Sequence, residues 1–301
     1  MQALYAFFQH EKANAAQFEK DLFKSLDKIH ELYFSILALL NDFHHVAMLV
    51  ADENKNKRLP GKDDLNPNMR FIENVFLVSL SNNEAFKKES DRRKISWQND
   101  ADVVRRLFNE IRATELYKNY LINPSTSAKD DCEFIVTLIT GFLSENAVLI
   151  SLFEEKNIHW ADDTFVAFNS VIRTIEEFSG EFKVQPLLKD EKDDLDFMSI
   201  LFNKTIIYKE QNRELIDRHT KNWEIERIAN MDMLLMEMAI TEILHVPQVP
   251  IKASLNEYID ISKEYSTPNS KIFVNGVLDK IIAELRRDNK IVKTGRGLKE
   301  S

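Results

Sequence analysis

The side chains that could bind a metal ion or attack a substrate are few, and their spacing suits neither task. His44 and His45 are adjacent, so on a helix they point about 100° apart and cannot hold one ion together. The single cysteine, Cys132, precedes an apolar helical pattern, and no histidine stands out as its base. We therefore interpret Cys132 as a packed or idle thiol rather than a nucleophile.

Three short motifs resemble functional signatures but lack essential residues. The DEKDD run at residues 190–194 has carboxylates but no glycine for a calcium-binding loop, and it is typical of a solvated acidic segment. Gly295 and Gly297 lack the third glycine and the preceding strand of a phosphate-binding loop. Asn203 begins a glycosylation sequon in the middle of a helical pattern. We therefore expect a protein that is not an enzyme, binds no metal and needs no cofactor.

The composition predicts an all-α fold. The chain has 301 residues but only 6 Gly and 7 Pro, too few turn residues for a many-stranded β sandwich or barrel. Apolar residues instead recur at steps of three and four, which is the spacing of one buried helix face. Examples of this spacing are Leu22, Leu26, Ile29, Tyr33 and Ile36.

Several features are typical of a cytoplasmic protein. One cysteine excludes an intramolecular disulfide and suits a reducing compartment. The longest uncharged apolar stretch, at about residues 134–144, is too short to span a bilayer. The N-terminal sequence MQALYAFFQHEK has neither the basic region nor the cleavage site of a signal peptide. We expect a cytoplasmic protein that does not associate with a membrane.

The net charge limits the kind of nucleic-acid contact. The chain has 40 Lys and Arg against 49 Asp and Glu, a formal net charge of −9, which argues against a protein that coats nucleic acid. A local basic patch can still bind phosphates, because nearby charge matters more than the total. Basic clusters lie at residues 55–62, 87–94, 105–106 and 286–299, although each alone is more typical of a solvated helix end or loop.

A faint internal repeat is visible when the chain is aligned, without gaps, on a shifted copy of itself. Loop-like segments lie at residues 52–69, 123–131 and 183–194, and the repeat falls between and after the last two. The aligned identities are Asp131 with Asp194, Phe134 with Phe197, Leu138 with Leu201, Leu152 with Leu215, and Trp160 with Trp223. Each copy reads as a long helix, a turn with a tryptophan and a second helix, which predicts two packed helix pairs. The alternative is a chance alignment of amphipathic helices.

The last third of the sequence predicts three consecutive helices. The first begins at Asn222 and is stopped by Pro247, because proline cannot continue the backbone hydrogen bonds. The second covers residues 251–266. The third carries an apolar stripe from Phe273 to Leu285, with Gly276 in its interior, where it suggests close approach of another helix.

This stretch resembles the NusB family of transcription antitermination factors over about residues 194–285. The matching segments are NWEIERIANMD (222–232), AITEIL (239–244), VPIKASLNEYIDISKEYS (249–266) and FVNGVLDKI (273–281). MQALYAFFQ at residues 1–9 resembles the family's first helix. RNA cytosine methyltransferases also carry a NusB-like domain, but no methyltransferase domain fits this chain.

The resemblance implies a helical protein without catalytic activity that binds the boxA element of nascent ribosomal RNA transcripts. It would do so with NusE, the ribosomal protein that doubles as a transcription factor, and act on the RNA polymerase elongation complex. The residues implied in RNA or partner binding are Tyr5, Asn269, Ser270, Lys271, Phe273 and Asn275. Phe273 also fits the buried stripe, whereas Asn269 and Lys271 lie at a helix start, where N–H groups favour an anion.

The resemblance also predicts the domain organisation. We expect a helical extension at residues 1–127, a helix-pair repeat unit at 128–190, a NusB-like core at 194–287 and a basic tail at 288–301. The chain starts inside the first helix, whereas family members usually carry an arginine-rich stretch before it, which leaves open whether the native chain starts further upstream. Met236 and Ile272 stand where basic residues are common. These departures keep open a second function, a protein-interaction scaffold that retains the bundle but has lost RNA binding.

Overall fold

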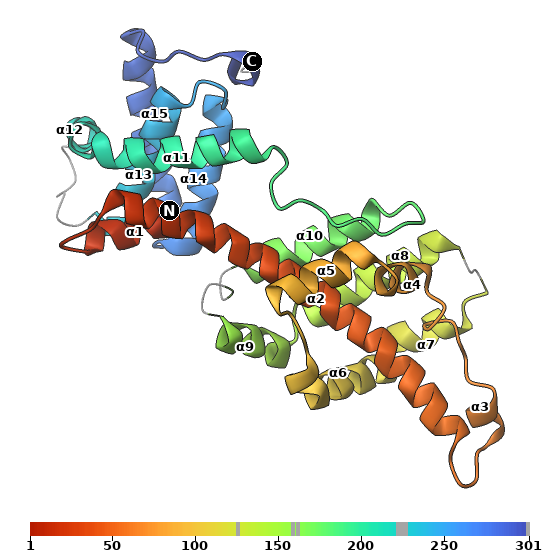
Figure 1. Ribbon diagram of the computed structural model, residues 1–301. Coiled ribbons are helices and arrows are strands. Elements are labelled where there is room, and N and C mark those ends of the chain that lie inside the picture. Colours follow the sequence, from red (N-terminus) through yellow and green to blue (C-terminus); the bar gives the residue numbers. More distant parts are fainter. Residues whose placement is uncertain (125–126, 158–159, 161–162, 221–227, 299–301) are drawn as a thin grey trace. The chain divides into compact units, whose positions relative to one another are not determined.

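The computed structural model describes residues 1–124, 127–157, 160, 163–220 and 228–298 (Figure 1). The described residues form helices, turns and loops and contain no β-strand, which confirms the all-α prediction. They form two compact units, one of Met1–Phe23 with Leu188–Ser301 and the other of Lys24–Leu187. The long helix α2 (Ala15–Lys55) contributes residues to both.

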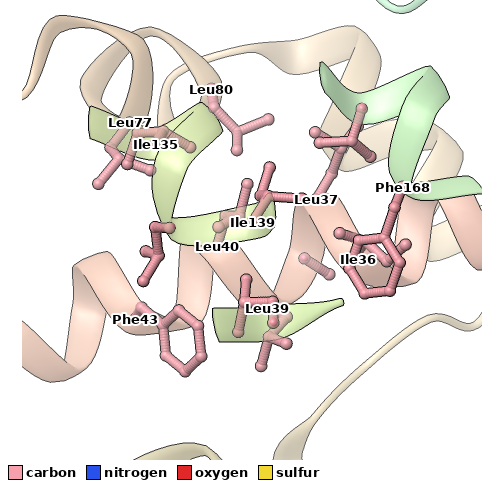
Figure 2. Close-up of a cluster of buried hydrophobic side chains, with 14 of the residues drawn as sticks. Ile36, Leu37, Leu39, Leu40, Phe43, Leu77, Leu80, Ile135, Ile139 and Phe168 are labelled. Carbon is pink, nitrogen blue, oxygen red and sulfur yellow. The ribbon is translucent and has the colours of Figure 1, made fainter. Parts of the chain in front are cut away.

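The unit of residues 24–187 has an aromatic-rich core around α2. Its further helices are α3 (Lys62–Leu65), α4 (Val75–Ser81), α5 (Glu84–Arg93), α6 (Ala101–Ala113), α7 (Glu115–Ile122), α8 (Ala128–Leu138), α9 (Ala147–Lys156) and α10 (Thr164–Glu176). Figure 2 shows side chains of α2, such as Leu40, meeting Leu77 of α4, Ile135 of α8 and Phe168 of α10. A π-helical turn, Ile139–Leu143, continues α8.

Helix α2 has the length and composition of a membrane span. Its 18-residue window has a mean hydropathy of 1.5, and 61% of that window is buried inside the protein. The longest uncharged stretch of the chain does not fall in this helix, because Asp42 interrupts its apolar residues. Burial of the segment from Leu32 to Leu40 in the core accounts for the apolar composition.

Asp131 of α8 makes hydrogen bonds to α7, to the loop before α4 and to the first residue of α4. Its Oδ1 accepts hydrogen bonds from the Tyr120 hydroxyl at 2.8 Å and from Arg70 Nη2 at 3.3 Å, and its Oδ2 accepts one from the Val75 amide at 3.0 Å. Four residues earlier, the Ser127 hydroxyl accepts a hydrogen bond from the Asp130 amide and caps α8. The segment at 123–131 therefore holds a helix cap, as its Ser and Asp residues predict.

The described residues include only one of the two tryptophans that the repeat aligns. Trp160 is buried between α9 and α10, and its Nε1 donates a 2.8 Å hydrogen bond to the Lys28 carbonyl. Trp223 lies outside the described residues. Helix α11 (Glu191–Ile207) begins at the residue that the repeat aligns with the first residue of α8. Helix α12 (Lys209–His219) likewise ends at the residue aligned with the last residue of α9. These bounds agree with the repeat, which stays a prediction. The predicted division of the chain into residues 1–127, 128–190, 194–287 and 288–301 also stays a prediction.

The other unit is a helical bundle around α13 (Asn230–His245). Its remaining helices are α1 (Gln2–Gln9), α11, α12, α14 (Ile251–Tyr265), α15 (Ser270–Arg287) and the short η5 (Gly295–Leu298). Helix α13 packs against α1, α11, α12, α14 and α15, and every residue from Asp232 to Ile243 is buried. A helix buried all round must be the core of its unit.

Two expectations for α13 are wrong. The helix begins at Asn230 rather than Asn222, since Ile228 and Ala229 are not helical and residues 221–227 lie outside the described part. Asp232 falls in its first turn, where a carboxylate is favourable beside the helix N-terminus. Met236 is 0% exposed, so its side chain is not part of a surface that could bind RNA.

The predicted basic tail is folded against the bundle as far as residue 298. The Thr294 amide donates a 2.9 Å hydrogen bond to the Pro247 carbonyl in the turn between α13 and α14. Gly297 is buried there, and a Cβ at this position would lie 2.2 Å from the Pro247 oxygen. We call residues 288–298 the strap.

Candidate nucleic-acid interface

The start of α15 is fixed by a buried hydrogen-bond network centred on Ser270. The Ser270 hydroxyl donates a 2.7 Å hydrogen bond to Oδ2 of Asp232 and accepts one from the Thr267 amide at 3.1 Å. The hydroxyl of Ser266 lies 3.0 Å from the Ser270 hydroxyl. Ser270 and Asp232 are 1% and 5% exposed. This network joins the N-terminal turns of α13 and α15 next to Asn269.

Asn269 and Lys271 stand at the exposed N-terminus of α15. Asn269 is the N-cap residue, but its side chain makes no capping hydrogen bond, and the first turn of the helix contains no acidic residue. Both side chains are exposed. The positive end of the helix dipole and the Lys271 ammonium therefore favour an anion at this point.

The outer face of α15 is open beside this end. Ile272 is 70% exposed, and among the described residues a Cβ added to Gly276 would meet no atom within 4 Å apart from the backbone of its own helix. The prediction that Gly276 allows close packing of another helix of this chain is therefore wrong, because its neighbours leave that face uncovered. Asn275 is half-buried on the same helix, and its Nδ2 donates a 3.2 Å hydrogen bond to Asp279 Oδ2. The open face therefore combines the apolar side chain of Ile272, the backbone of Gly276 without a side chain, and the polar side chain of Asn275.

The two aromatic candidates lie on different helices. Phe273 is half-buried and packs against the core, as its place in the apolar stripe predicts. Tyr5 is 38% exposed on α1, which packs against α13, and neighbouring Leu4 is buried in the core. The structure thus gathers Asn269, Ser270, Lys271, Phe273 and Asn275 in the first turns of α15, whereas Tyr5 belongs to another helix of the same unit.

Buried carboxylates in the bundle have structural partners rather than a catalytic arrangement. Glu242 accepts hydrogen bonds from the Ser254 hydroxyl at 2.6 Å and the Tyr258 hydroxyl at 2.8 Å. Burial and the Glu242 charge raise the pKa of Tyr258 well above its ordinary value. Among the described residues, no group of three or more His, Cys, Asp or Glu side chains could hold a metal ion.

The sequence patterns do not single out Asp232, which accepts the hydrogen bond of Ser270 from a position 38 residues earlier in the chain. A local signal exists, since an acidic residue followed by an apolar run often marks a helix start. The apolar pattern instead places Asp232 in the interior of a longer helix beginning at Asn222. The side chain of Ser270, included among the RNA- or partner-binding candidates, has its hydroxyl engaged inside the protein.

Comparisons with known proteins match the C-terminal part of the chain. A family model described as the NusB family matches residues 165–283. The transcription antitermination protein NusB of Salinibacter ruber is 46% identical over 111 residues, which are 37% of this chain and 69% of that protein. The protein of the same name from Chloroherpeton thalassium is 43% identical over 107 residues, 34% of this chain and 49% of that protein. The protein of the same name from Natranaerobius thermophilus is 26% identical over 112 residues, which are 36% of this chain and 81% of that protein.

No solved structure matches the chain. The family match begins at residue 165, inside α10, and so starts earlier than the resemblance of the sequence motifs, which begins at about residue 194. Its larger part covers α11 to α15, which belong to the bundle unit. The N-terminal residues 1–9 lie outside the match, but the structure places them in the same unit as the matched helices.

Proposed function

The chain belongs to the NusB family of transcription antitermination proteins, and from this premise we propose that it binds boxA-like RNA of nascent ribosomal RNA transcripts together with NusE. Proteins of this family are antitermination factors and not enzymes. The complex would act on the RNA polymerase elongation complex in the cytoplasm.

The observation that carries the RNA proposal is the N-terminus of α15. Lys271 and Asn269 are exposed there, on a helix start that the buried bond between Ser270 and Asp232 holds in place. Because the site is fixed before binding, little conformational entropy is lost when a phosphate is bound. Tyr5 provides an exposed ring on which a base of single-stranded RNA can stack.

The open face of α15 supports a protein partner. Ile272 and Gly276 leave an apolar, flat area next to the polar side chain of Asn275. Such a combination suits a protein contact better than an RNA backbone, because phosphates gain nothing from an exposed isoleucine. We assign this face to NusE and the helix N-terminus beside it to RNA.

The alternative is a scaffold that retains the bundle and has lost RNA binding. The net charge of −9 and the exposed apolar Ile272, at a position where a basic residue is common, favour this alternative. The two functions differ in a measurable way, since a scaffold would bind NusE without binding RNA.

A salt titration of RNA binding separates them. We expect the full chain to bind a labelled single-stranded boxA-like RNA weakly on its own and more tightly with NusE. Lys271→Glu should weaken binding and make the dependence of log affinity on log salt shallower by about 0.7, the value for one phosphate contact on a single strand. Lys192→Glu, an equal charge change at the exposed start of α11, should have no effect. Failure of the chain to bind RNA at low salt even with NusE would establish the scaffold alternative.

A further inference from the structure

The strap and the helix ends beneath it form a second basic surface, at the other end of α15 from Lys271. We infer that this surface is a second contact for single-stranded RNA, an inference that rests on the proposed function. The surface consists of Lys204, Tyr208, Lys290, Lys293 and Arg296, and we call it the basic end.

The strap is held in a fixed place although it follows the last long helix. Asn289 adopts a left-handed conformation with φ of 52°, and the Lys290 amide donates a 2.9 Å hydrogen bond to the Leu285 carbonyl, which ends α15. Ile291 then packs against the core, and the Thr294 amide bonds to Pro247. Gly297 approaches Pro247 so closely that no side chain fits. These contacts present the cations of the strap on a rigid support.

The charge of this segment differs from that of the whole chain. Residues 286–298 contain five Lys and Arg against one acidic residue, Asp288, whereas the chain has a net charge of −9. Asp288 pairs with Arg287 at 3.3 Å and with Lys290 at 3.8 Å, and α15 contributes Glu284, which is bound by Arg218 and His219. Arg296 is exposed on the strap. The segment therefore has an excess of positive charge, which suits a polyanion.

The basic end continues onto the ends of three other helices. Lys293 Nζ donates a 3.2 Å hydrogen bond to the Val246 carbonyl, at the end of α13. The ring of His245 stacks on that of Tyr208 with centroids 4.5 Å apart, and Lys204 Nζ lies 5.4 Å from the Tyr208 centroid. Burial and the Lys204 charge lower the pKa of His245. Lys204 thus lies against a half-buried aromatic pair, and Lys293 is bonded to the residue that follows His245 in the chain.

An aromatic ring among cations favours single-stranded RNA over other polyanions. Exposed bases stack on aromatic side chains, and cations follow the phosphates, whereas the bases of a duplex are already stacked. The flexible Lys204 side chain covers one side of the Tyr208 ring and can move to a phosphate when a base takes its place. Helix α15 has 18 residues, so its two ends are roughly 27 Å apart, and one RNA strand can contact both.

The test uses the full chain and a labelled single-stranded RNA, with binding followed by fluorescence anisotropy over a range of salt concentrations. Lys290→Glu with Arg296→Glu removes two exposed cations and should make the log–log salt slope shallower by about 1.4. The matched control is Lys189→Glu with Lys192→Glu, the same charge change at exposed residues before and in α11, and should leave the slope unchanged. Tyr208→Leu should weaken binding about tenfold without changing the slope, because stacking involves no phosphate.

The outcomes distinguish this inference from the proposed function. If Lys271→Glu weakens binding while the double variant of the strap matches its control, RNA binding stands and the basic end is not part of it. If Tyr208→Leu binds as the parent chain does, or if duplex RNA binds as tightly as the single strand, the single-strand assignment is wrong. If the parent chain binds no RNA with NusE present, both proposals fail. Urea unfolding of each variant verifies that the bundle remains folded.

Discussion

Ser270 donates a 2.7 Å hydrogen bond to the buried carboxylate of Asp232, and this single bond links the first turn of α15 to the first turn of α13. The other carboxylate oxygen of Asp232 is buried and has no hydrogen-bond partner among the residues that the structure describes. This hydroxyl group therefore adds a polar link at the proposed RNA site to the apolar packing of α15 against α13. Its loss would leave a buried carboxylate without this donor.

Ser270→Ala should lower the free energy of unfolding by about 1.5–3 kcal/mol, because hydrogen bonds to charged groups contribute that much and the carboxylate stays buried. Urea unfolding of the full chain measures the change. Asn269→Ala, one residue earlier but exposed and without a capping bond, should change it by less than about 0.5 kcal/mol. Equal effects of the two substitutions would show that the network does not stabilise the bundle.

Substitution by alanine should have opposite effects on stability at two glycines, Gly297 and Gly276. Gly297→Ala would place a Cβ 2.2 Å from the Pro247 carbonyl oxygen, so we expect a loss of about 1–3 kcal/mol and release of the strap from the α13–α14 turn. Gly276→Ala meets open space on a helix and should add up to about 1 kcal/mol. Hydrogen exchange of the Thr294 amide reports the release. An unchanged exchange rate in Gly297→Ala would contradict the close fit.

Trp160→Ala should cost about 3–5 kcal/mol, because the indole is buried and its Nε1 donates to the Lys28 carbonyl. The repeat predicts that Trp223→Ala has a similar cost, and thermal unfolding of both variants tests this. A cost for Trp160 but none for Trp223 would remove the idea that the two tryptophans occupy equivalent places.

Glu237 should make the bundle less stable as the pH rises. Burial raises the pKa of its carboxyl above the ordinary value of 4.5, and the bond from Arg213 Nε at 2.6 Å opposes the rise. A carboxyl with a raised pKa holds its proton more tightly in the folded state. The free energy of unfolding therefore falls as the pH rises from about 4.5 through the raised pKa.

Glu237→Gln has no proton to lose, so its stability should fall less than that of the parent chain over this range. Urea unfolding at a series of pH values measures the difference. Glu264→Gln, at an exposed position of α14, is the control and should follow the parent chain. A Glu237→Gln variant with the parent pH dependence would show that burial of this carboxyl costs no stability.

Much of the bundle could be predicted from local patterns. The stripe of Val277, Ile281 and Leu285 is buried as its spacing predicts, and Pro250 precedes the first residue of α14. Such features depend on one segment, so the sequence of that segment determines them. The family resemblance rests on the same segments and is confirmed by the comparisons.

Other features depend on partners that no local pattern reveals. The apolar residues of α13 surround the helix, so no polar face marked Met236 as buried, and the start of the helix was placed too early. An interior glycine suits both close packing and open space, and only the neighbours of Gly276 decide between them. The bond between Thr294 and Pro247 joins two backbones and leaves no side-chain pattern, so the strap could not be predicted.

The central claim is that this chain recognises boxA-like RNA together with NusE, and the most direct test is the sequence specificity of that complex. Fluorescence anisotropy would compare a boxA-like RNA with a scrambled RNA of the same length and composition, at one salt concentration and with NusE present. Base contacts of about 1–3 kcal/mol each predict that the boxA-like RNA binds more than about tenfold more tightly. Equal affinity for both RNAs, or no binding of either, would contradict the account.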